Sequence, residues 1–183
     1  MRELSLHILD IAENGITAGA KCIHILVDEA RSGNVLTLKI EDNGRGMPPD
    51  KLEKLKDPFV TSRTTRRVGL GLPLLAAAAE RCNGSVNVKT KPGIGTEVLA
   101  TFAYNHIDRA PIGDMASTIT TLILGNPKVD FVYTHIIDGN DFILDTRELR
   151  EDSNDLTLSD PMVIYHLTQS IRENLSNLAA NQT

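Results

Sequence analysis

Two pairs of segments with alternating apolar and polar side chains constrain the fold of this chain most strongly. Residues 23–29 and 35–42 flank the turn RSGN, and residues 85–90 and 96–104 flank the turn KPGIG. Such alternation is typical of strands that are buried on one face, and short turns join antiparallel neighbours. The sequence therefore predicts two β-hairpins.

A segment with helical spacing precedes each hairpin. Residues 3–19 repeat apolar side chains at the interval of a helix, and residues 70–82 are rich in leucine and alanine and end at Asn83-Gly84. Residues 48–55 predict a short helix, and residues 57–68 show no period and predict a loop. The order of elements predicts an α+β fold of two layers, with helices on one face of a mixed, mainly antiparallel sheet.

The remaining residues predict a small C-terminal α/β appendage. A helix is expected over 115–124, a hairpin over 130–146 around the turn DGN, and a last helix from Pro161 onwards. We therefore divide the chain into a domain at residues 1–104 and a helix-hairpin-helix region at 105–183, for which the sequence indicates no role.

Charge and hydropathy exclude several classes of partner. The net charge is −5 and the isoelectric point is about 5.5, which disfavours a nucleic-acid or anionic membrane surface. No apolar run approaches the roughly 20 residues that span a bilayer, and the N-terminal residues do not resemble a signal peptide, so we expect a cytoplasmic protein. Cys22 and Cys82 lack metal-ligand spacing and predict buried, reduced thiols rather than a disulfide or a zinc site.

The first predicted helix carries a polar stripe. At about 100° per residue, Glu3, His7, Asp10 and Asn14 fall within an arc of about 60°. Such a stripe is either the solvated face of a surface helix or a set of side chains that face a common ligand. For His7 alone, a histidine on the helix surface is the favoured interpretation.

Three glycine-containing segments favour the second interpretation, in which the polar side chains of the helix face a common ligand. DNGRGM at 42–47 follows a strand, GLGL at 69–72 opens a helix, and GIGT at 93–96 forms a turn. Glycine lets a backbone approach a flat ligand closely, and backbone N–H groups at the start of a helix attract phosphate. Their order along the chain is more specific than any one of them.

This series of motifs resembles that of the Bergerat-fold (GHKL) ATPases, which include DNA gyrase, the heat-shock chaperones of the ninety-kilodalton class, histidine kinases and mismatch-repair ATPases. The resemblance covers residues 3 to about 104 and implies a histidine-kinase-like ATP-binding domain. It implies that Asn14 ligates Mg²⁺, that Asp10 orients or deprotonates an attacking water, and that Asp42 accepts the adenine amino group. The other nucleotide-binding positions that it implies are Gly44, Gly46, Met47, Arg63, Gly69, Leu70, Gly71, Leu72 and Thr96, with Thr96 supporting Asp42 through water.

Two functions follow from this resemblance. One is Mg²⁺-dependent ATP binding with slow hydrolysis or phosphotransfer to a separate protein, as in a regulatory ATPase or an anti-sigma-type kinase. Many hydrolytic members of the family carry glutamate where this chain has Asp10, and a carboxylate withdrawn by about 1 Å slows catalysis. PFVTSR at 58–63 resembles the lid segment of the family. The alternative function is a non-hydrolytic, ATP-gated regulator or scaffold that engages a protein partner or a second copy of the chain through this lid segment and residues 105–183.

Overall fold

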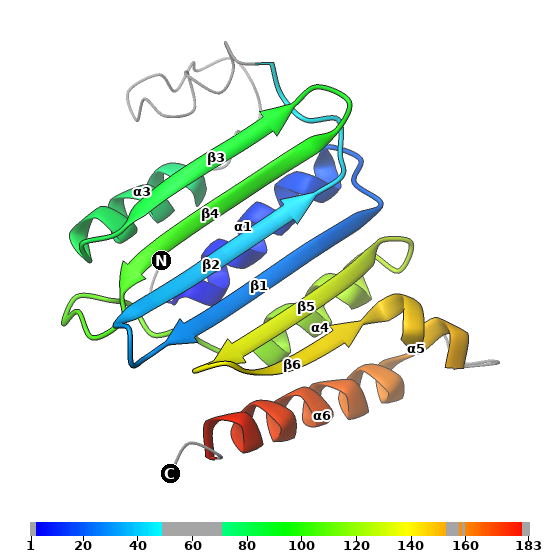
Figure 1. Ribbon diagram of the computed structural model, residues 1–183. Helices are drawn as coiled ribbons and strands as arrows, with labels where there is room; N and C mark the ends of the chain where they lie inside the picture. The colour runs from blue at the N-terminus through cyan, green and yellow to red at the C-terminus, as the bar shows by residue number, and fades with distance from the viewer. Residues whose placement is uncertain (1–2, 49–70, 153–157, 159, 181–183) are drawn as a thin grey trace.

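The computed structural model describes residues 3–48, 71–152, 158 and 160–180, and its strands form one sheet (Figure 1). The helices are α1 (Leu4–Thr17), α3 (Gly71–Arg81), α4 (Met115–Gly125), α5 (Thr146–Asp152) and α6 (Pro161–Ala180). The strands are β1 (Cys22–Ala30), β2 (Val35–Asp42), β3 (Ser85–Lys91), β4 (Gly95–Ala103), β5 (Asp130–Ile137) and β6 (Asn140–Asp145). The helix predicted at 48–55 lies, apart from Pro48, outside the described residues, as does the loop predicted at 57–68.

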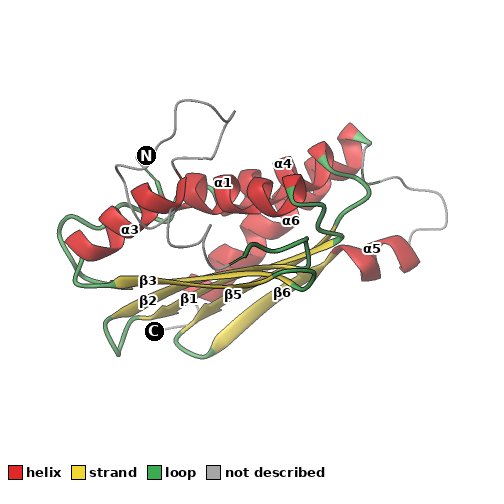
Figure 2. Ribbon diagram, turned by 90° about the horizontal axis from the view of Figure 1, so that it is seen from above, coloured by secondary structure: helices red, strands yellow, loops and turns green. Residues whose placement is uncertain are grey.

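The six strands follow the order β3-β4-β2-β1-β5-β6. Both predicted hairpins are present, and every neighbouring pair is antiparallel except β1 and β5, which are parallel. Figure 2 shows α1, α3 and α4 together on one side of the sheet. The predicted α+β fold, with helices layered on one face of a mixed sheet, is therefore confirmed.

The core lies between α1, α3 and the helix-covered face of the sheet. Alternate residues of each strand point into it, so that Leu36, Leu38 and Ile40 of β2 are all at most 2% exposed. The apolar side of α1 meets them through Leu4 and Ile8, which are both fully buried. Each such side chain stabilises the fold by about 1.5–3 kcal/mol, and this packing sets α1 firmly across the sheet.

The C-terminal hairpin extends the same sheet. Strand β5 runs beside β1 from the pair Cys22 and Asp130 to the pair Glu29 and Ile137. Asp138 and Gly139 both have positive φ, 44° and 88°, as a tight hairpin turn between β5 and β6 requires. Helix α6 packs along α4 and against the β5–β6 end of the sheet.

Asp114 fixes the start of α4. Its carboxylate accepts hydrogen bonds from the backbone N–H of Ser117 at 2.9 Å and from Arg172 of α6 at 2.7 Å. These donors, the Ser117 N–H foremost, lower the pKa of Asp114 to about 2. The N-cap therefore also ties α6 to α4.

A buried polar network joins β1, β5 and the residue that follows β4. The Glu29 carboxylate contacts Nε2 of His135 at 2.8 Å and accepts a hydrogen bond from the Tyr104 hydroxyl at 2.9 Å. Nδ1 of His135 lies 2.6 Å from the hydroxyl of Tyr133, which is fully buried. Burial would raise the pKa of Glu29, but the hydrogen bonds from His135 and Tyr104 outweigh it and lower that pKa.

Two expectations from composition can be compared with the fold. Among the described helices, none has the length and apolar character that crossing a bilayer demands. Both cysteines are free; Cys82 is buried as expected, whereas Cys22 is only half-buried. The prediction of burial was wrong for Cys22 because its side chain stands on the sheet face opposite α1 and α3.

Candidate nucleotide-binding site

Asp42 ends β2 on the helix-covered face of the sheet. Its side chain follows Leu38 and Ile40 in the alternation and reaches the end of α1, where Gly15 lies against it. A Cβ on Gly15 would stand 2.9 Å from Cβ of Asp42 and 3.2 Å from its Oδ2. Only glycine permits this close approach of α1 to the Asp42 carboxylate.

The backbone that follows Asp42 turns back to hold it. The N–H of Gly44 donates to Oδ1 of Asp42 at 2.8 Å, and a Cβ on Gly44 would stand 2.9 Å from the same oxygen. Burial raises the pKa of Asp42 above its usual range, and the N–H groups of Gly44 and Thr96 offset part of that rise. Asp42 is thus a half-buried acceptor that is oriented by backbone donors.

Thr96 joins this group from β4. It is the cross-strand partner of Asp42, and its hydroxyl lies 3.1 Å from that of Thr90 on β3. The Thr90 hydroxyl oxygen in turn accepts a hydrogen bond from the N–H of Met47 at 2.8 Å. The structure therefore brings the DNGRGM and GIGT segments together, as a shared ligand requires.

The DNGRGM loop is held on both sides. The N–H of Arg45 donates to the carbonyl of Ala18 at 3.0 Å, and the N–H of Gly93 donates to the carbonyl of Arg45 at 2.8 Å. Gly46 has a φ of 62° and passes so close to the carbonyl of Lys91 that a Cβ has no room. The loop is therefore a fixed wall between α1 and the β3–β4 turn.

Asp10 meets the first residue of α3. A Cβ on Gly71 would stand 2.8 Å from Oδ2 of Asp10, so the start of α3 lies directly against this carboxylate. Gly71 is buried and Leu72 is half-buried. The start of α3 carries the positive end of a helix dipole, which favours a neighbouring negative group.

Asn14 lies one turn beyond Asp10 on α1 and directly precedes Gly15. Its side chain is exposed, so a ligand could reach it without any change in the core. Arg63, Gly69 and Leu70 lie outside the described residues. The described candidates form two groups, Asp10 with Gly71 and Asp42 with Gly44 and Thr96, and Asn14 lies between these groups on α1.

His7 is not the surface histidine that the sequence favoured. It is 2% exposed; burial lowers its pKa, and a hydrogen bond to the backbone of Gly71 opposes this effect. Its Nδ1 has no hydrogen-bond partner among the described residues. The prediction was wrong because the start of α3 covers this part of α1, although the spacing of His7 from Leu4 and Ile11 matches the apolar side of the helix.

Asp42 and Thr96 also line a separate cavity of about 370 Å³. Most of its side chains, including Cys22, His24 and Glu97, belong to the sheet face that α1 and α3 do not cover. We therefore do not assign this cavity to the group around Asp42 on the helix-covered face.

Sequence relatives agree with the motifs. Residues 2–106 match the family described as "Histidine kinase-, DNA gyrase B-, and HSP90-like ATPase". An uncharacterised sensor-like histidine kinase of Rhizobium meliloti is 40% identical over 82 residues, which are 42% of this chain and 16% of that protein. Sporulation kinase C of Bacillus subtilis is 27% identical over 94 residues, which are 51% of this chain and 22% of that protein. The chain thus spans less than a quarter of the length of these relatives.

Solved structures share the fold. The MutL ATPase domain of Aquifex aeolicus, complexed with ADP, superposes with a TM-score of 0.53 at 15% identity, covering 93% of this chain and 70% of that one. The N-terminal domain of a DNA repair protein gives the same TM-score at 16% identity, covering 79% of this chain and 53% of that one. At these identities the likeness concerns the fold alone.

The family match spans more than half of the chain and includes Asp10, Asn14, Asp42 and Thr96. The fold likeness to the solved structures agrees with this match. The chain carries an ATP-binding domain and belongs to the family of histidine kinase-, DNA gyrase B- and HSP90-like ATPases.

Proposed function

We propose that the chain binds ATP with Mg²⁺ and acts as a regulatory ATPase or as a kinase that phosphorylates a separate protein. The observation that carries the proposal is the half-buried Asp42, which Gly15 and Gly44 approach without side chains and which the Gly44 N–H orients at 2.8 Å. A half-buried carboxylate that a backbone N–H holds in one orientation suits the exocyclic amino group of adenine, which donates hydrogen bonds. Thr96 would support Asp42 through a water molecule, and Met47, Gly44 and Gly46 would shape the wall against the base.

Asn14 is our proposed protein ligand for Mg²⁺. Mg²⁺ takes most of its ligands from water and phosphate oxygens, so a single exposed amide oxygen is a sufficient contribution from the chain. Charge repulsion gives a second argument for a bound cation. Phosphates that approach the start of α3 at Gly71 would meet the Asp10 carboxylate, and a cation offsets that repulsion.

Asp10 is our proposed group for orienting or deprotonating the attacking nucleophile. Phosphoryl transfer depends chiefly on positioning and on neutralising charge, and does not require a strong base. Asp10 is confined by Gly71, and its side chain is one methylene shorter than glutamate. We therefore expect slow turnover. Gly69, Leu70, Gly71, Leu72 and Arg63 complete our proposed phosphate side of the site.

The specific test of nucleotide recognition is calorimetry with ATP and GTP in the presence of Mg²⁺. A hydrogen bond to a charged group contributes about 1.5–3 kcal/mol, so we expect ATP to bind at least about tenfold more tightly than GTP. Asp42→Asn should remove most of this preference. Glu41→Gln, at an exposed neighbour on the opposite sheet face, should keep it. Equal affinities for ATP and GTP in the wild-type chain would contradict the assignment of Asp42.

The test of reaction class is incubation with ATP labelled at the γ-phosphate, alone and with candidate partner proteins. Free phosphate indicates hydrolysis, and a labelled partner indicates a kinase. Loss of either product in Asp10→Asn would support the role of Asp10, whereas full activity in that variant would reject it.

A non-hydrolytic, ATP-gated regulator is the second candidate. The observation that favours it is the short, confined Asp10 together with a C-terminal hairpin that shares a sheet with the nucleotide-binding elements. In this case residues 105–183 would present a surface to a protein partner or a second copy of the chain. ATP would then remain unchanged in the labelling experiment while the partner's affinity depended on it. For either function, we expect the chain to act in the cytoplasm.

A further inference from the structure

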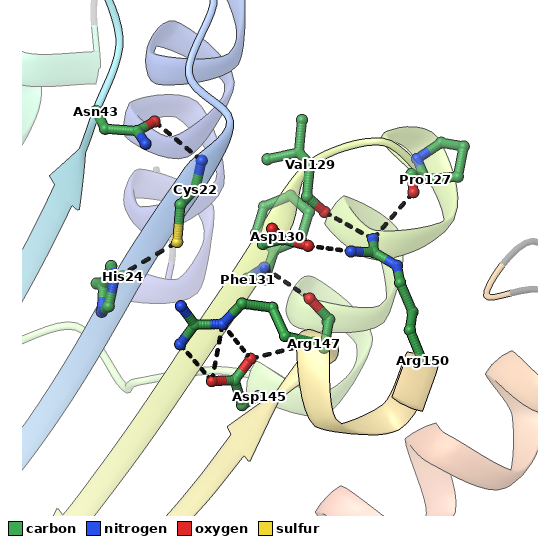
Figure 3. A network of polar contacts seen from close by, with 11 residues as sticks. Cys22, His24, Asn43, Pro127, Val129, Asp130, Phe131, Asp145, Arg147 and Arg150 are labelled. Atoms are coloured by element: carbon green, nitrogen blue, oxygen red, sulfur yellow. Dashed lines mark hydrogen bonds and ion pairs between the residues drawn. The ribbon is translucent and has the colours of Figure 1, made fainter. Parts of the chain in front are cut away.

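Cys22 and His24 stand side by side on the sheet face opposite α1 and α3. They are two residues apart on β1, so both side chains point to the same face, and Sγ of Cys22 lies 3.4 Å from Nε2 of His24 (Figure 3). Both side chains line the cavity of about 370 Å³ behind Asp42. A sulfur and an imidazole nitrogen therefore converge at the wall of an open cavity.

The separation of these two atoms suits chelation. Zinc bonds sulfur at about 2.3 Å and imidazole nitrogen at about 2.0–2.1 Å, so a tetrahedral angle places the two donors about 3.6 Å apart. The observed separation of 3.4 Å is close to this value, and small rotations of these two side chains, neither of which is buried, can make up the difference. The two atoms are thus close to the spacing that a shared cation requires.

Glu41 is the nearest source of a third donor. It pairs with His24 across β1 and β2, and therefore lies on the same face. Oε2 of Glu41 lies 3.0 Å from Nζ of Lys39, and the same Nζ lies 3.1 Å from Oε2 of Glu97. If the Glu41 side chain rotates towards His24, Lys39 therefore still has an ion-pair partner. No three His, Cys, Asp or Glu side chains of the described residues converge as they stand. The protein thus supplies two donors directly, and water or a rotated Glu41 completes the shell.

We propose that Cys22 and His24 form a site for one borderline-soft divalent cation of the Zn²⁺ type. On binding, the Cys22 thiol releases its proton to solvent as sulfur bonds the metal, and His24 binds through a neutral nitrogen. Sulfur and imidazole donors select zinc-like cations over Mg²⁺, which prefers oxygen. The site is therefore distinct from the Mg²⁺ position proposed at Asn14, and it does not depend on nucleotide.

The groups around Cys22 argue against the alternative that its thiol is a reactive nucleophile. Burial raises the pKa of Cys22, and the Arg147 guanidinium only partly offsets this. Arg147 is held at the Asp145 carboxylate by two hydrogen bonds from its Nε, at 2.9 and 3.1 Å (Figure 3). Without a metal, the thiol therefore stays protonated at neutral pH and is a poor nucleophile.

The proposed cation would bind close to the DNGRGM loop. Oδ1 of Asn43 accepts hydrogen bonds from the N–H groups of Lys21 and Cys22, at 2.7 and 2.9 Å. The N–H of Asn43 donates to the carbonyl of Cys22 at 3.3 Å. Asn43 directly follows Asp42, so these hydrogen bonds would link a metal on Cys22 to the nucleotide-binding face.

The test uses the full chain, stripped of metal and kept free of nucleotide. Iodoacetamide labelling of Cys22 and of the buried Cys82 is followed by peptide mass spectrometry while Zn²⁺ is added. At ten times its dissociation constant, Zn²⁺ should slow labelling of Cys22 about tenfold, because about one site in eleven stays free. Cys82 should be unaffected, and Mg²⁺ should give no protection at either cysteine.

Co²⁺ provides a spectroscopic check on the ligands. It should give a thiolate-to-metal absorption band with a stoichiometry of one per chain, and Cys22→Ser should abolish that band. His24→Ala should strongly weaken both the band and the Zn²⁺ protection, while His166→Ala, at another exposed histidine, should change neither. Unchanged labelling of Cys22 in Zn²⁺, or equal protection in His24→Ala, would overturn the proposal. Because no nucleotide is present, these outcomes are independent of ATP binding.

Discussion

The contact between Gly15 and Asp42 predicts that Gly15→Ala disrupts nucleotide binding more than folding. The new Cβ would lie 2.9 Å from Cβ of Asp42, whereas ordinary contacts begin at 3.4 Å, so the two groups must separate by about 0.5 Å. A shift of that size moves the carboxylate out of hydrogen-bonding position with a ligand amino group. Gly15 is therefore a sensitive probe of the role proposed for Asp42.

The stability change has two opposing parts. Forcing a methyl group into a packed contact costs about 1–3 kcal/mol, and replacing a glycine inside a helix recovers about 1 kcal/mol. We therefore expect a net loss between about 0 and 2 kcal/mol. In contrast, loss of a hydrogen bond to a charged acceptor weakens binding by about 1.5–3 kcal/mol, or roughly 10-fold to 150-fold in affinity.

The assay is calorimetry with ATP and Mg²⁺, together with thermal unfolding of the same preparations. Gly125→Ala is the matched control because a Cβ there would meet nothing within 4 Å at the end of α4. The control should leave ATP affinity unchanged. A folded Gly15→Ala chain that binds ATP within about twofold of wild type would refute the assignment of this carboxylate to the nucleotide.

Three further predictions concern the metal, the pH dependence and the buried network. Asn14→Ala should leave the fold intact, because the side chain is exposed, and should remove most of the additional thermal stabilisation that Mg²⁺ gives in the presence of ATP; equal stabilisation of both proteins would reject this ligand. Because burial raises the pKa of Asp42, the ATP-to-GTP affinity ratio should fall as the pH drops, starting above the range in which an ordinary aspartate titrates; a flat ratio down to that range would contradict it. Glu29→Ala removes the acceptor for Tyr104 and the partner of His135, so urea unfolding should show a loss of about 2–5 kcal/mol. The pKa of Glu29 is lowered in the fold, so its contribution is complete above the ordinary glutamate range and is lost as the pH falls through the lowered value; the difference from wild type should therefore shrink in acid, and a constant difference would count against this account.

The local elements could be predicted because their signals are local. The pattern over 3–19 matches α1 at Leu4–Thr17, and the alternation over 35–42 matches β2 at Val35–Asp42. Each pattern reports which side of one element is buried, and that information lies within a few neighbouring residues. The turn Asp138-Gly139 is likewise identified by its own residue types.

The long-range pairing could not be predicted in the same way. Strand β5 lies parallel to β1, although roughly 100 residues separate Cys22 from its partner Asp130. Nothing in either segment names its neighbour, because any half-buried strand presents the same alternation. The short helix α5 (Thr146–Asp152) was also missed, since seven residues give fewer than two turns of periodicity.

The same contrast between local signals and long-range contacts applies to the candidate site. Polar residues with a chemical role, such as Asp10 and Asp42, are visible in sequence because they interrupt apolar patterns. Gly15 and the buried position of His7 were missed, because each depends on a neighbour from a distant segment. That neighbour is Asp42 for Gly15 and Gly71 for His7.

Strand β1 connects the two parts of the chain in a way that limits how they can communicate. At one end, Cys22 is bonded to Asn43, beside Asp42. At the other end, Glu29 contacts His135 of β5, and the two strands pair along the whole length between these points. A hinge between the C-terminal hairpin and the nucleotide-binding elements would have to break that ladder and expose the buried Glu29, at a cost of several kcal/mol. We therefore infer that the hairpin is a fixed platform, and that any partner bound there is held at a constant position relative to Asp42.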